Sequence, residues 1–480
     1  MIEKKQERHL NRMTNIAPLP FTPERLLKAT GGVFLCSNPN AVFTSVSINS
    51  REIDKKGIFI AVKGENHDGH DFVTDVINTG IKGVIIDKSK KDLFSVADME
   101  KAGVLCLVVD NTIKALGNLA KLQRLETGVK LIAITGSNGK TSTRAMTAAI
   151  LEQKFETHST SGNFNNEIGL PLTLLKLGKA HEWAVVELGM NAPGEITRLA
   201  KICMPDIGII TNAGAAHLEG LGTIKNVAKA KGELLQAINE NGAAVVNENL
   251  PLLAELTENI KASVSLFGNS NAAALKAKDI EAADGSVRFM LQMDGKSEPV
   301  KLNTPGIFMV SNALAAATAG MIVGLDIKTI RDGLENFVPV NGRINVIKSN
   351  RGYNLIDDTY NANPDSMIAA ITTLKSLKGT SRGYFVMGDM MELGKNAAVF
   401  HKKIGAFTAE TGIEELYATG LNANIVSEGA KSNGMSSEYI FTGSKKEIIN
   451  SLLKKLNKND WVLIKGSRSM AMEEIVKGLS

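Results

Sequence analysis

The chain has 480 residues, 44% of them hydrophobic, and a formal net charge of +5. This length predicts roughly two to four domains, and the mixed charges argue against a nucleic-acid-binding surface. No apolar run reaches the roughly 18 residues that a membrane-spanning helix needs. Three cysteines, Cys36, Cys106 and Cys203, lie far apart in the sequence without metal-ligand spacing. An odd, sparse set of this kind predicts reduced thiols and a cytoplasmic protein.

The first residues are basic and polar, with no apolar stretch behind them, so they do not resemble a secretory signal. We expect residues 1–21 to be a loose extension and residues 22–128 to form the first domain. In that domain short apolar strands alternate with helical stretches, which predicts a small α/β sheet. The strands are expected at 57–62, 83–86 and 104–109, and the helices at 26–30, 72–78 and 112–125.

The second domain, residues 129–342, begins with the strongest local motif of the chain. Leu131–Ile134 predict a buried strand, and a helix is expected from Lys140 to about Gln153. The glycines between them would let the backbone approach an anion closely. Successive backbone N–H groups and the helix dipole would then point at that anion. The motif therefore predicts a phosphate-binding loop.

Two side chains of this loop have expected roles. Lys140 would reach the outer phosphates of a nucleotide, and the Thr141 hydroxyl would bind Mg²⁺. Ile134 stands where the general P-loop has its first glycine, so the loop is a short form. This difference argues against a motor ATPase or a GTPase.

Polar residues end two further strands of the second domain. A strand at 183–186 ends at Glu187, and a strand at 206–211 ends at Asn212. In open α/β sheets, ligands bind at the carboxyl ends of the strands, and the phosphate loop lies at such an end too. A combined metal and nucleotide site is therefore expected at this edge.

The rest of the second domain is expected to continue the α/β pattern. Asp294-Gly295 predicts the turn of a hairpin between strands at 287–293 and 299–302. Further strands are expected at 243–247 and 264–268, and helices at 224–239, 310–323 and 327–337.

Residues 343–480 alternate again and predict a doubly wound, Rossmann-like sheet without the G-x-G-x-x-G motif. Three polar loops follow strands of this domain: 357–364, 388–394 and 465–468. The strands are expected at 353–356, 384–387, 415–418, 439–441 and 461–464, and the helices at 364–377, 397–411, 445–456 and 470–479.

Taken together, these segments resemble the Mur ligase family over nearly all of residues 22–480. Asn49-Ser50-Arg51 departs from the resemblance, because the family usually has Asp-Ser-Arg there. The markers are Thr135-Gly-Ser-Asn-Gly-Lys-Thr141, Asn163-Phe-Asn-Asn-Glu-Ile-Gly-Leu-Pro171, Glu187-Leu-Gly-Met, Thr211-Asn212 with His217-Leu-Glu219, Ala230-Lys231-Gly-Glu, Asp358-Thr-Tyr-Asn-Ala-Asn-Pro364, Gly388-Asp-Met-Met-Glu-Leu-Gly394 and Lys465-Gly-Ser-Arg468.

The resemblance implies three domains, which bind in turn a UDP-muropeptide, ATP with Mg²⁺, and an incoming dipeptide. It also implies an ATP-dependent ligase that adds D-alanyl-D-alanine to UDP-N-acetylmuramoyl-tripeptide through an acyl phosphate. This is a cytoplasmic step of peptidoglycan precursor synthesis, and so of cell-wall growth, cell shape and division. We expect a monomer that does not bind nucleic acid and has no membrane-spanning segment.

The resemblance also assigns roles to single residues. Lys140, Glu187, His217 and Lys231 would be catalytic. Metal ligands would be Thr141, Glu187, His217 and Lys231, the last as a carbamate derived from CO₂. The residues implied at ATP are Gly136, Ser137, Asn138, Gly139, Lys140, Thr141, Ser142, Asn312, Arg343 and Asp358. Those implied at the substrates are Ser50, Arg51, Asn163, Asn166, Asp389, Glu392, His401, Lys465 and Arg468.

Two alternatives stay open at this point. A folylpolyglutamate synthase shares the short phosphate loop, but it is not expected to carry Tyr360-Asn-Ala-Asn-Pro364. A nucleotide-binding protein without ligase activity would be favoured by the loss of Lys140, Glu187, His217 or Lys231, and all four are present.

Overall fold

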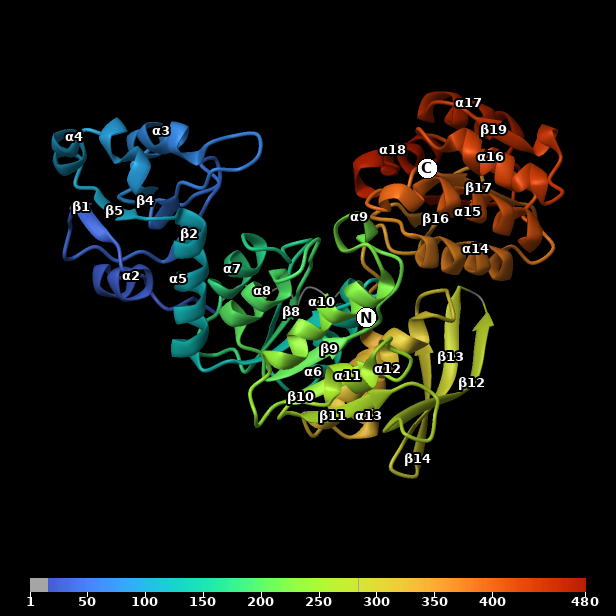
Figure 1. Cartoon of the computed structure of the whole chain (residues 1–480), viewed down its shortest axis with the longest axis horizontal. Coiled ribbons are helices and arrows are strands. Elements are labelled where there is room, and N and C mark those ends of the chain that lie inside the picture. Colours follow the sequence, from blue (N-terminus) through green and yellow to red (C-terminus); the bar gives the residue numbers. More distant parts are fainter. Residues whose placement is uncertain (1–15, 284) are drawn as a thin grey trace.

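The computed structural model describes residues 16–283 and 285–480, which form three α/β units in sequence order (Figure 1). The first and last units lie at opposite ends of the middle one. Most of the extension expected over residues 1–21 lies outside the described residues. Its last residue, Phe21, is buried, and its N–H donates to the Phe43 carbonyl oxygen at 2.8 Å. Within the described residues, no helix is both long and apolar enough to cross a bilayer.

The first unit is built on a five-stranded sheet in the order β1-β5-β4-β3-β2, parallel except for β1. Cys36 of β1 is paired in register with Cys106 of β5, and all three cysteines of the chain are free and buried. The strands are β1 Val33–Cys36, β2 Ser45–Ser47, β3 Gly57–Ile60, β4 Gly83–Asp87 and β5 Leu105–Val109; the helices are α2 Pro23–Thr30, α3 Val73–Asn78, α4 Val96–Lys101 and α5 Thr112–Thr127.

The middle unit has a nine-stranded sheet in the order β14-β13-β12-β11-β10-β9-β6-β8-β7. Strands β7 to β11 and β6 run parallel, and β12, β13 and β14 form an antiparallel extension. The strands are β6 Lys130–Thr135, β7 Thr157–Ser159, β8 Trp183–Glu187, β9 Ile207–Ile210, β10 Ala243–Asn247, β11 Ser263–Phe267, β12 Leu275–Ala283, β13 Ser286–Met293 and β14 Lys296–Leu302.

Helices cover this sheet and connect its strands. The Ala-rich helix α12 packs on α6, the helix that follows the phosphate loop, and its small residues are almost all buried. The predicted helix after the loop ends at Leu151, two residues before the expected Gln153. The helices are α6 Lys140–Leu151, α7 Gly169–Leu174, α8 Glu195–Cys203, α9 Leu218–Leu221, α10 Ile224–Gln236, α11 Leu253–Thr257, α12 Met309–Ile322 and α13 Ile327–Asn336.

The last unit confirms the expected doubly wound sheet, in the order β15-β16-β20-β17-β18-β19. All neighbours are parallel except β15, which runs antiparallel to β16 at the edge. The strands are β15 Asn345–Lys348, β16 Asn354–Asp358, β17 Gly383–Met387, β18 Glu415–Ala418, β19 Ile440–Thr442 and β20 Trp461–Lys465; the helices are α14 Pro364–Lys378, α15 Ala397–Thr411, α16 Ala423–Ser432, α17 Lys445–Lys455 and α18 Glu473–Leu479.

Candidate active site

The phosphate loop connects β6 to α6, and two of its positions accept only glycine. Gly136 has φ +157° and Gly139 has φ +80°. A Cβ on Gly136 would lie 1.8 Å from Thr211 Oγ1, and one on Gly139 would lie 2.1 Å from Asn312 Oδ1. Thr211 and Asn312 of α12 therefore pack directly against the backbone of the loop, and neither glycine position has room for a side chain.

Lys140 is the first residue of α6, and its Nζ donates to the Gly136 carbonyl oxygen at 2.8 Å. Although the residue as a whole is only partly buried, desolvation of the ammonium lowers its pKa, while nearby Glu187 opposes that shift. The first backbone N–H groups of a helix have no carbonyl partner within it. This helix start therefore offers N–H groups and a cation at one place, which suits an anion.

Glu187, at the end of β8, lies beside the loop as expected. The residue is 3% exposed. One carboxylate oxygen accepts from the Thr141 hydroxyl at 3.0 Å, and the other accepts from Asn165 Nδ2 at 3.0 Å. Arg144 Nε, one turn into α6, is 4.0 Å from the same carboxylate. The pairing of β6 with both β8 and β9 brings these strand ends together, which confirms the arrangement inferred from the sequence.

Asn212, after β9, closes the other side of the loop. Its Oδ1 accepts from the Asn138 backbone N–H at 2.8 Å, and its Nδ2 donates to the Asn138 carbonyl oxygen at 3.1 Å. The Thr211 hydroxyl donates to that carbonyl oxygen as well, at 2.6 Å. The backbone of Asn138 is thus fixed by three bonds from one strand end.

Lys231 of α10 is 1% exposed, although it is a lysine. Burial, with repulsion from Lys140 as a smaller cause, lowers the pKa of its amine well below the ordinary value. Among the described residues, no carboxylate forms an ion pair with it. A buried lysine without a counter-ion is costly as an ammonium and favours the neutral amine.

His217 meets a residue of the last unit. Its Nδ1 lies 2.6 Å from Glu392 Oε2, but the ring N–H is not aligned for a hydrogen bond. Contact with His217 lowers the pKa of the Glu392 carboxyl. Both residues have positive φ, +55° and +63°, in a region that few non-glycine residues adopt. The backbone N–H of Glu219 also donates to the Glu392 carbonyl oxygen at 3.0 Å.

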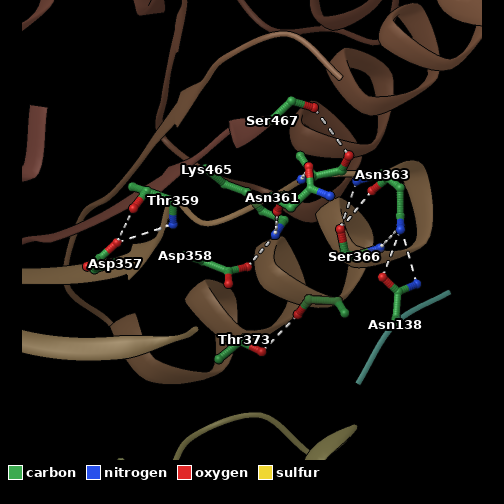
Figure 2. A network of polar contacts seen from close by, with 12 residues as sticks. Asn138, Asp357, Asp358, Thr359, Asn361, Asn363, Ser366, Thr373, Lys465 and Ser467 are labelled. Carbon is green, nitrogen blue, oxygen red and sulfur yellow. Dashed lines mark hydrogen bonds and ion pairs between the residues drawn. The ribbon is translucent and has the colours of Figure 1, made fainter. Parts of the chain in front are cut away.

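The loop after β16 brings a second part of the last unit to the site (Figure 2). The Lys465 ammonium is buried and pairs with Asp358 Oδ2 at 2.5 Å, and it also donates to the Asn361 carbonyl oxygen. Burial lowers the pKa of Lys465, and the Asp358 charge opposes this. Arg343 stacks on the Tyr360 ring, with its guanidinium carbon 4.0 Å from the ring centroid.

All three units line one cleft of about 450 Å³. The first unit contributes Ile113 of α5. The middle unit contributes Lys140, Glu187 and His217, with Asn165 and Asn166 from the loop before α7. From the last unit and its junction come Arg343, Tyr360, Asn361 and Glu392. Sites for small ligands commonly have this size.

Other predicted residues lie at the margin of the cleft or away from it. Asn166 lines the cleft, and its Oδ1 accepts from the N–H groups of Ile168 and Gly169. Asn163 is exposed, and Ser50 and Arg51 follow β2 on the first unit. Arg468 pairs with Glu473 at the surface of the last unit.

Two predicted residues are buried inside the last unit. Asp389 is 2% exposed, and its carboxylate accepts from the N–H groups of Leu421 and Asn422 at 2.7 and 3.1 Å. His401 is fully buried; its Nε2 accepts from the Met390 N–H, and its Nδ1 contacts the Ala397 carbonyl oxygen. Both side chains hold the 388–394 loop in place, and neither faces the cleft.

Several residues of the site were not predicted from the sequence. Asn165, Arg144 and Tyr360 all contact predicted residues, and Asn363 pairs with the predicted Asn138 across two units (Figure 2). Asn165, Tyr360 and Asn363 lie inside the motifs quoted above. These three could have been predicted because they belong to the motifs. Arg144 lies outside every quoted motif, so no sequence signal pointed to it.

Comparisons with known proteins agree over most of the chain. Family models match residues 42–124 (Mur ligase family, catalytic domain), 134–320 (Mur ligase middle domain) and 342–468 (Mur ligase, glutamate ligase domain). The UDP-N-acetylmuramoyl-tripeptide--D-alanyl-D-alanine ligase of Escherichia coli is 36% identical over 440 residues, which cover 91% of this chain and 93% of that protein.

Solved structures give the same result. MurF from Acinetobacter baumannii superposes with a TM-score of 0.87 at 32% identity, covering 97% of this chain and 99% of that one. MurF ligase from Thermotoga maritima, in complex with ADP, superposes with a TM-score of 0.78 at 28% identity, over 91% and 96% of the two chains. The chain belongs to the Mur ligase family.

Proposed function

We propose that this chain is an ATP-dependent ligase that joins D-alanyl-D-alanine to UDP-N-acetylmuramoyl-tripeptide, in the cytoplasm and as a monomer. The observation that carries the proposal is the single cleft lined by the phosphate loop, Glu187, His217 and residues of the last unit. The names and coverage of the relatives support the same substrates. Residues 22–128 would hold the UDP end of the muropeptide, 129–342 the nucleotide and metal, and 343–480 the dipeptide.

The reaction has two steps. A terminal carboxylate oxygen of the tripeptide attacks the γ-phosphorus of ATP, ADP leaves, and an acyl phosphate forms. The amine of the dipeptide then attacks the acyl carbon through a tetrahedral intermediate, loses a proton, and inorganic phosphate leaves. The protein mainly positions these anions and stabilises their charge, because without it they would repel one another.

The nucleotide would lie at the phosphate loop. Lys140 and the N–H groups from Gly139 to Ser142 would hold its phosphates. Asn312 packs against Gly139, and Arg343 lines the cavity at the loop with Ser137 and Asn138. Gly136 would let the backbone approach the phosphates, and Asp358 of the last unit would contact the nucleotide. The Thermotoga maritima relative was solved with ADP, which supports this use of the fold. The stacked Arg343 and the ion-paired Asp358 are already fixed in position by Tyr360 and Lys465.

The Thr141 and Glu187 oxygens fit Mg²⁺ better than a metal ion that is bound by protein side chains alone. Among the described residues, no cluster of three or more histidine, cysteine, aspartate or glutamate side chains could hold a metal ion. Mg²⁺ is commonly bound by one or two protein oxygens plus phosphates and water. Thr141 and Glu187, with oxygens 3.0 Å apart, would supply those ligands. When bound, the ion would neutralise charge on the transferring phosphoryl group.

Lys231 would carry a carbamate formed from its neutral amine and CO₂. Its burial and its lowered pKa favour the amine that reacts. The product is a carboxylate on a long arm, which would serve with His217 as a ligand for a second Mg²⁺. An unmodified ammonium at this position would repel the ion.

The substrates would contact the margins of the cleft. Ser50 and Arg51, with Asn163 and Asn166, would bind the muropeptide. Glu392 would meet the dipeptide ammonium. Asp389 and His401 would act by holding the loop that carries Glu392, because their polar atoms bond within that unit. Lys465 and Arg468 would supply positive charge nearby.

The test is direct. The protein is incubated with ATP, Mg²⁺, a UDP-muramoyl tripeptide and D-Ala-D-Ala, and the product is analysed by mass. We expect the pentapeptide together with one phosphate released per bond. A reaction without each component in turn is the control. Failure to form the pentapeptide while a glutamate-accepting folate substrate is extended would show that the alternative ligase class is right.

A further inference from the structure

Two asparagine side chains join the phosphate loop to the last unit (Figure 2). Asn363 Nδ2 donates to Asn138 Oδ1 at 2.8 Å, and Asn138 Nδ2 donates to Asn363 Oδ1 at 3.3 Å. Each amide is thus donor and acceptor to the other. A reciprocal pair of this kind fixes both the distance and the orientation of the two segments.

Both asparagines are also held by hydrogen bonds within their own units. The Asn138 backbone is fixed by Thr211 and Asn212, as described above. On the other side, Asn363 Oδ1 also accepts from the Ser366 N–H at 3.0 Å and so caps helix α14. The pair therefore connects the loop that would hold phosphate to the start of a 15-residue helix.

A second contact lies beside the pair. Asp365, in the first turn of α14, accepts from the Ala215 N–H through Oδ2 at 3.1 Å. A Cβ on Gly214 would lie 2.1 Å from that same oxygen. The start of α14 is therefore seated closely on the loop after β9, next to the phosphate loop.

This seating leaves little room at the loop. The cavity that residues 137–142 share with Arg343 and residues 361–363 has a volume of about 60 Å³. Small-molecule sites usually have roughly 300–1,000 Å³. Ser137, Lys140 and residues 361–363 also line the larger cleft described above. A nucleotide that entered between the loop and α14 would have to displace the start of α14, because this side of the loop is filled.

We propose that the Asn138–Asn363 amide pair is a latch, which keeps the start of α14 on the phosphate loop in the empty chain and must open when nucleotide binds. The inference rests on the proposed nucleotide site. Because the latch stabilises only the empty state, it lowers apparent nucleotide affinity. In return it ties occupancy of the loop to the position of the last unit.

The test compares ADP binding, with Mg²⁺, in the full-length parent and in Asn363→Ser. Serine keeps an oxygen that can cap α14 but is too short to pair with Asn138. Calorimetry should give a Kd about tenfold lower than that of the parent, as expected for the loss of two neutral hydrogen bonds from the empty state. Stopped-flow mixing with a fluorescent ADP analogue should show faster association.

Two further variants separate the latch from a structural role. Ser366→Ala removes the hydroxyl that accepts from the Asn363 N–H at 3.0 Å but leaves the amide pair, so its Kd should match that of the parent. In an Asn138→Ala background the latch is already lost. Asn363→Ser should then change the Kd no further, which a general effect on α14 would not produce.

The outcomes are distinct. Tighter binding in Asn363→Ser that disappears in the Asn138→Ala background supports the latch. Equal or weaker binding in Asn363→Ser, with ADP bound by the parent, overturns the latch and leaves the proposed function intact. If neither the parent nor Asn363→Ser binds ADP, the proposed nucleotide site is wrong, and the latch falls with it.

Discussion

Lys140 is the residue whose removal should cost most activity. Its ammonium lies at the start of α6, where the charge of a transferring phosphoryl group would build up. Lys140→Ala should reduce turnover by about 10²- to 10³-fold or more, since a pre-positioned charge contact in a closed site is worth that much. Steady-state phosphate release measures this. Unchanged thermal unfolding would show an intact fold, and near-normal turnover would exclude Lys140 from the phosphate site.

Lys231 should be as important for activity as Lys140. If its carbamate binds metal, Lys231→Ala should be nearly inactive, and a short carboxylic acid such as acetate should restore part of the rate. Lys229→Ala is the matched control, because Lys229 lies on the same helix and pairs with Glu255 at the surface. Full activity of Lys231→Ala in CO₂-depleted buffer would show that the second metal site is wrongly assigned.

The burial of Lys231 could have been found without the structure. In α10 the buried positions include Val227, Leu234 and Leu235. Lys231 follows Val227 by one helical turn, so periodicity places it on the apolar face. Lys225 and Lys229 lie on the other face and are exposed. Lys231 was singled out by its motif alone, and the helical phase, which distinguishes it from Lys225 and Lys229, was not used.

At the scale of elements, strands with compact apolar runs were predicted well, and charged or irregular ones were missed. Strand β12 alternates weakly hydrophobic residues with Lys, Asp and Glu. Its register shifts between Lys278 and Glu281, and Asp279 has φ +51°. Such a bulge breaks the two-residue period on which strand prediction depends. The neighbouring hairpin was predicted because Asp-Gly is a residue pair that such turns favour. In the structure Asp294 and Gly295 both adopt the positive φ that the turn needs.

The loop at 388–394 should contribute to dipeptide binding. Asp389→Ala removes a carboxylate that holds the N–H groups of Leu421 and Asn422, and the loop that carries Glu392 should loosen. The Michaelis constant for D-Ala-D-Ala should then rise more than that for ATP. Steady-state kinetics with each substrate varied in turn measures the difference.

A matched control is available in the same unit. Glu414 also accepts from a backbone N–H, that of Gly383 at 2.6 Å, but it does not line the cleft. Glu414→Ala should destabilise the unit without changing the dipeptide constant selectively. Equal rises in both Michaelis constants for Asp389→Ala would contradict a role of the loop in dipeptide binding.

For the whole molecule, the fold of each unit followed from its own segment of sequence, but the contacts between units did not. The His217–Glu392 contact and the Asn138–Asn363 pair each join residues far apart in the chain. Neither strand alternation nor helix periodicity carries information about such pairs. Motif order located the residues, and only the structure shows which of them touch across a domain boundary.

The last unit is expected to move during the reaction. It joins the middle unit through residues 342–344, where Gly342 and Ile344 have φ +72° and +55°. Positive φ at a buried, β-branched residue is rare and places conformational strain at this junction. The nucleotide and dipeptide residues lie on different units, so the orientation of the last unit decides how closely the reacting groups meet.

Small-angle scattering can detect this movement. A non-hydrolysable ATP analogue with Mg²⁺ and a UDP-muramoyl tripeptide should reduce the radius of gyration, because the first and last units now lie at opposite ends of the middle one (Figure 1). Lys140→Ala is the control, since it should bind the analogue poorly and remain extended. Superimposable profiles with and without ligands, at concentrations shown by calorimetry to saturate the sites, would mean that the cleft is already in its reactive arrangement and that residues 342–344 are not a hinge.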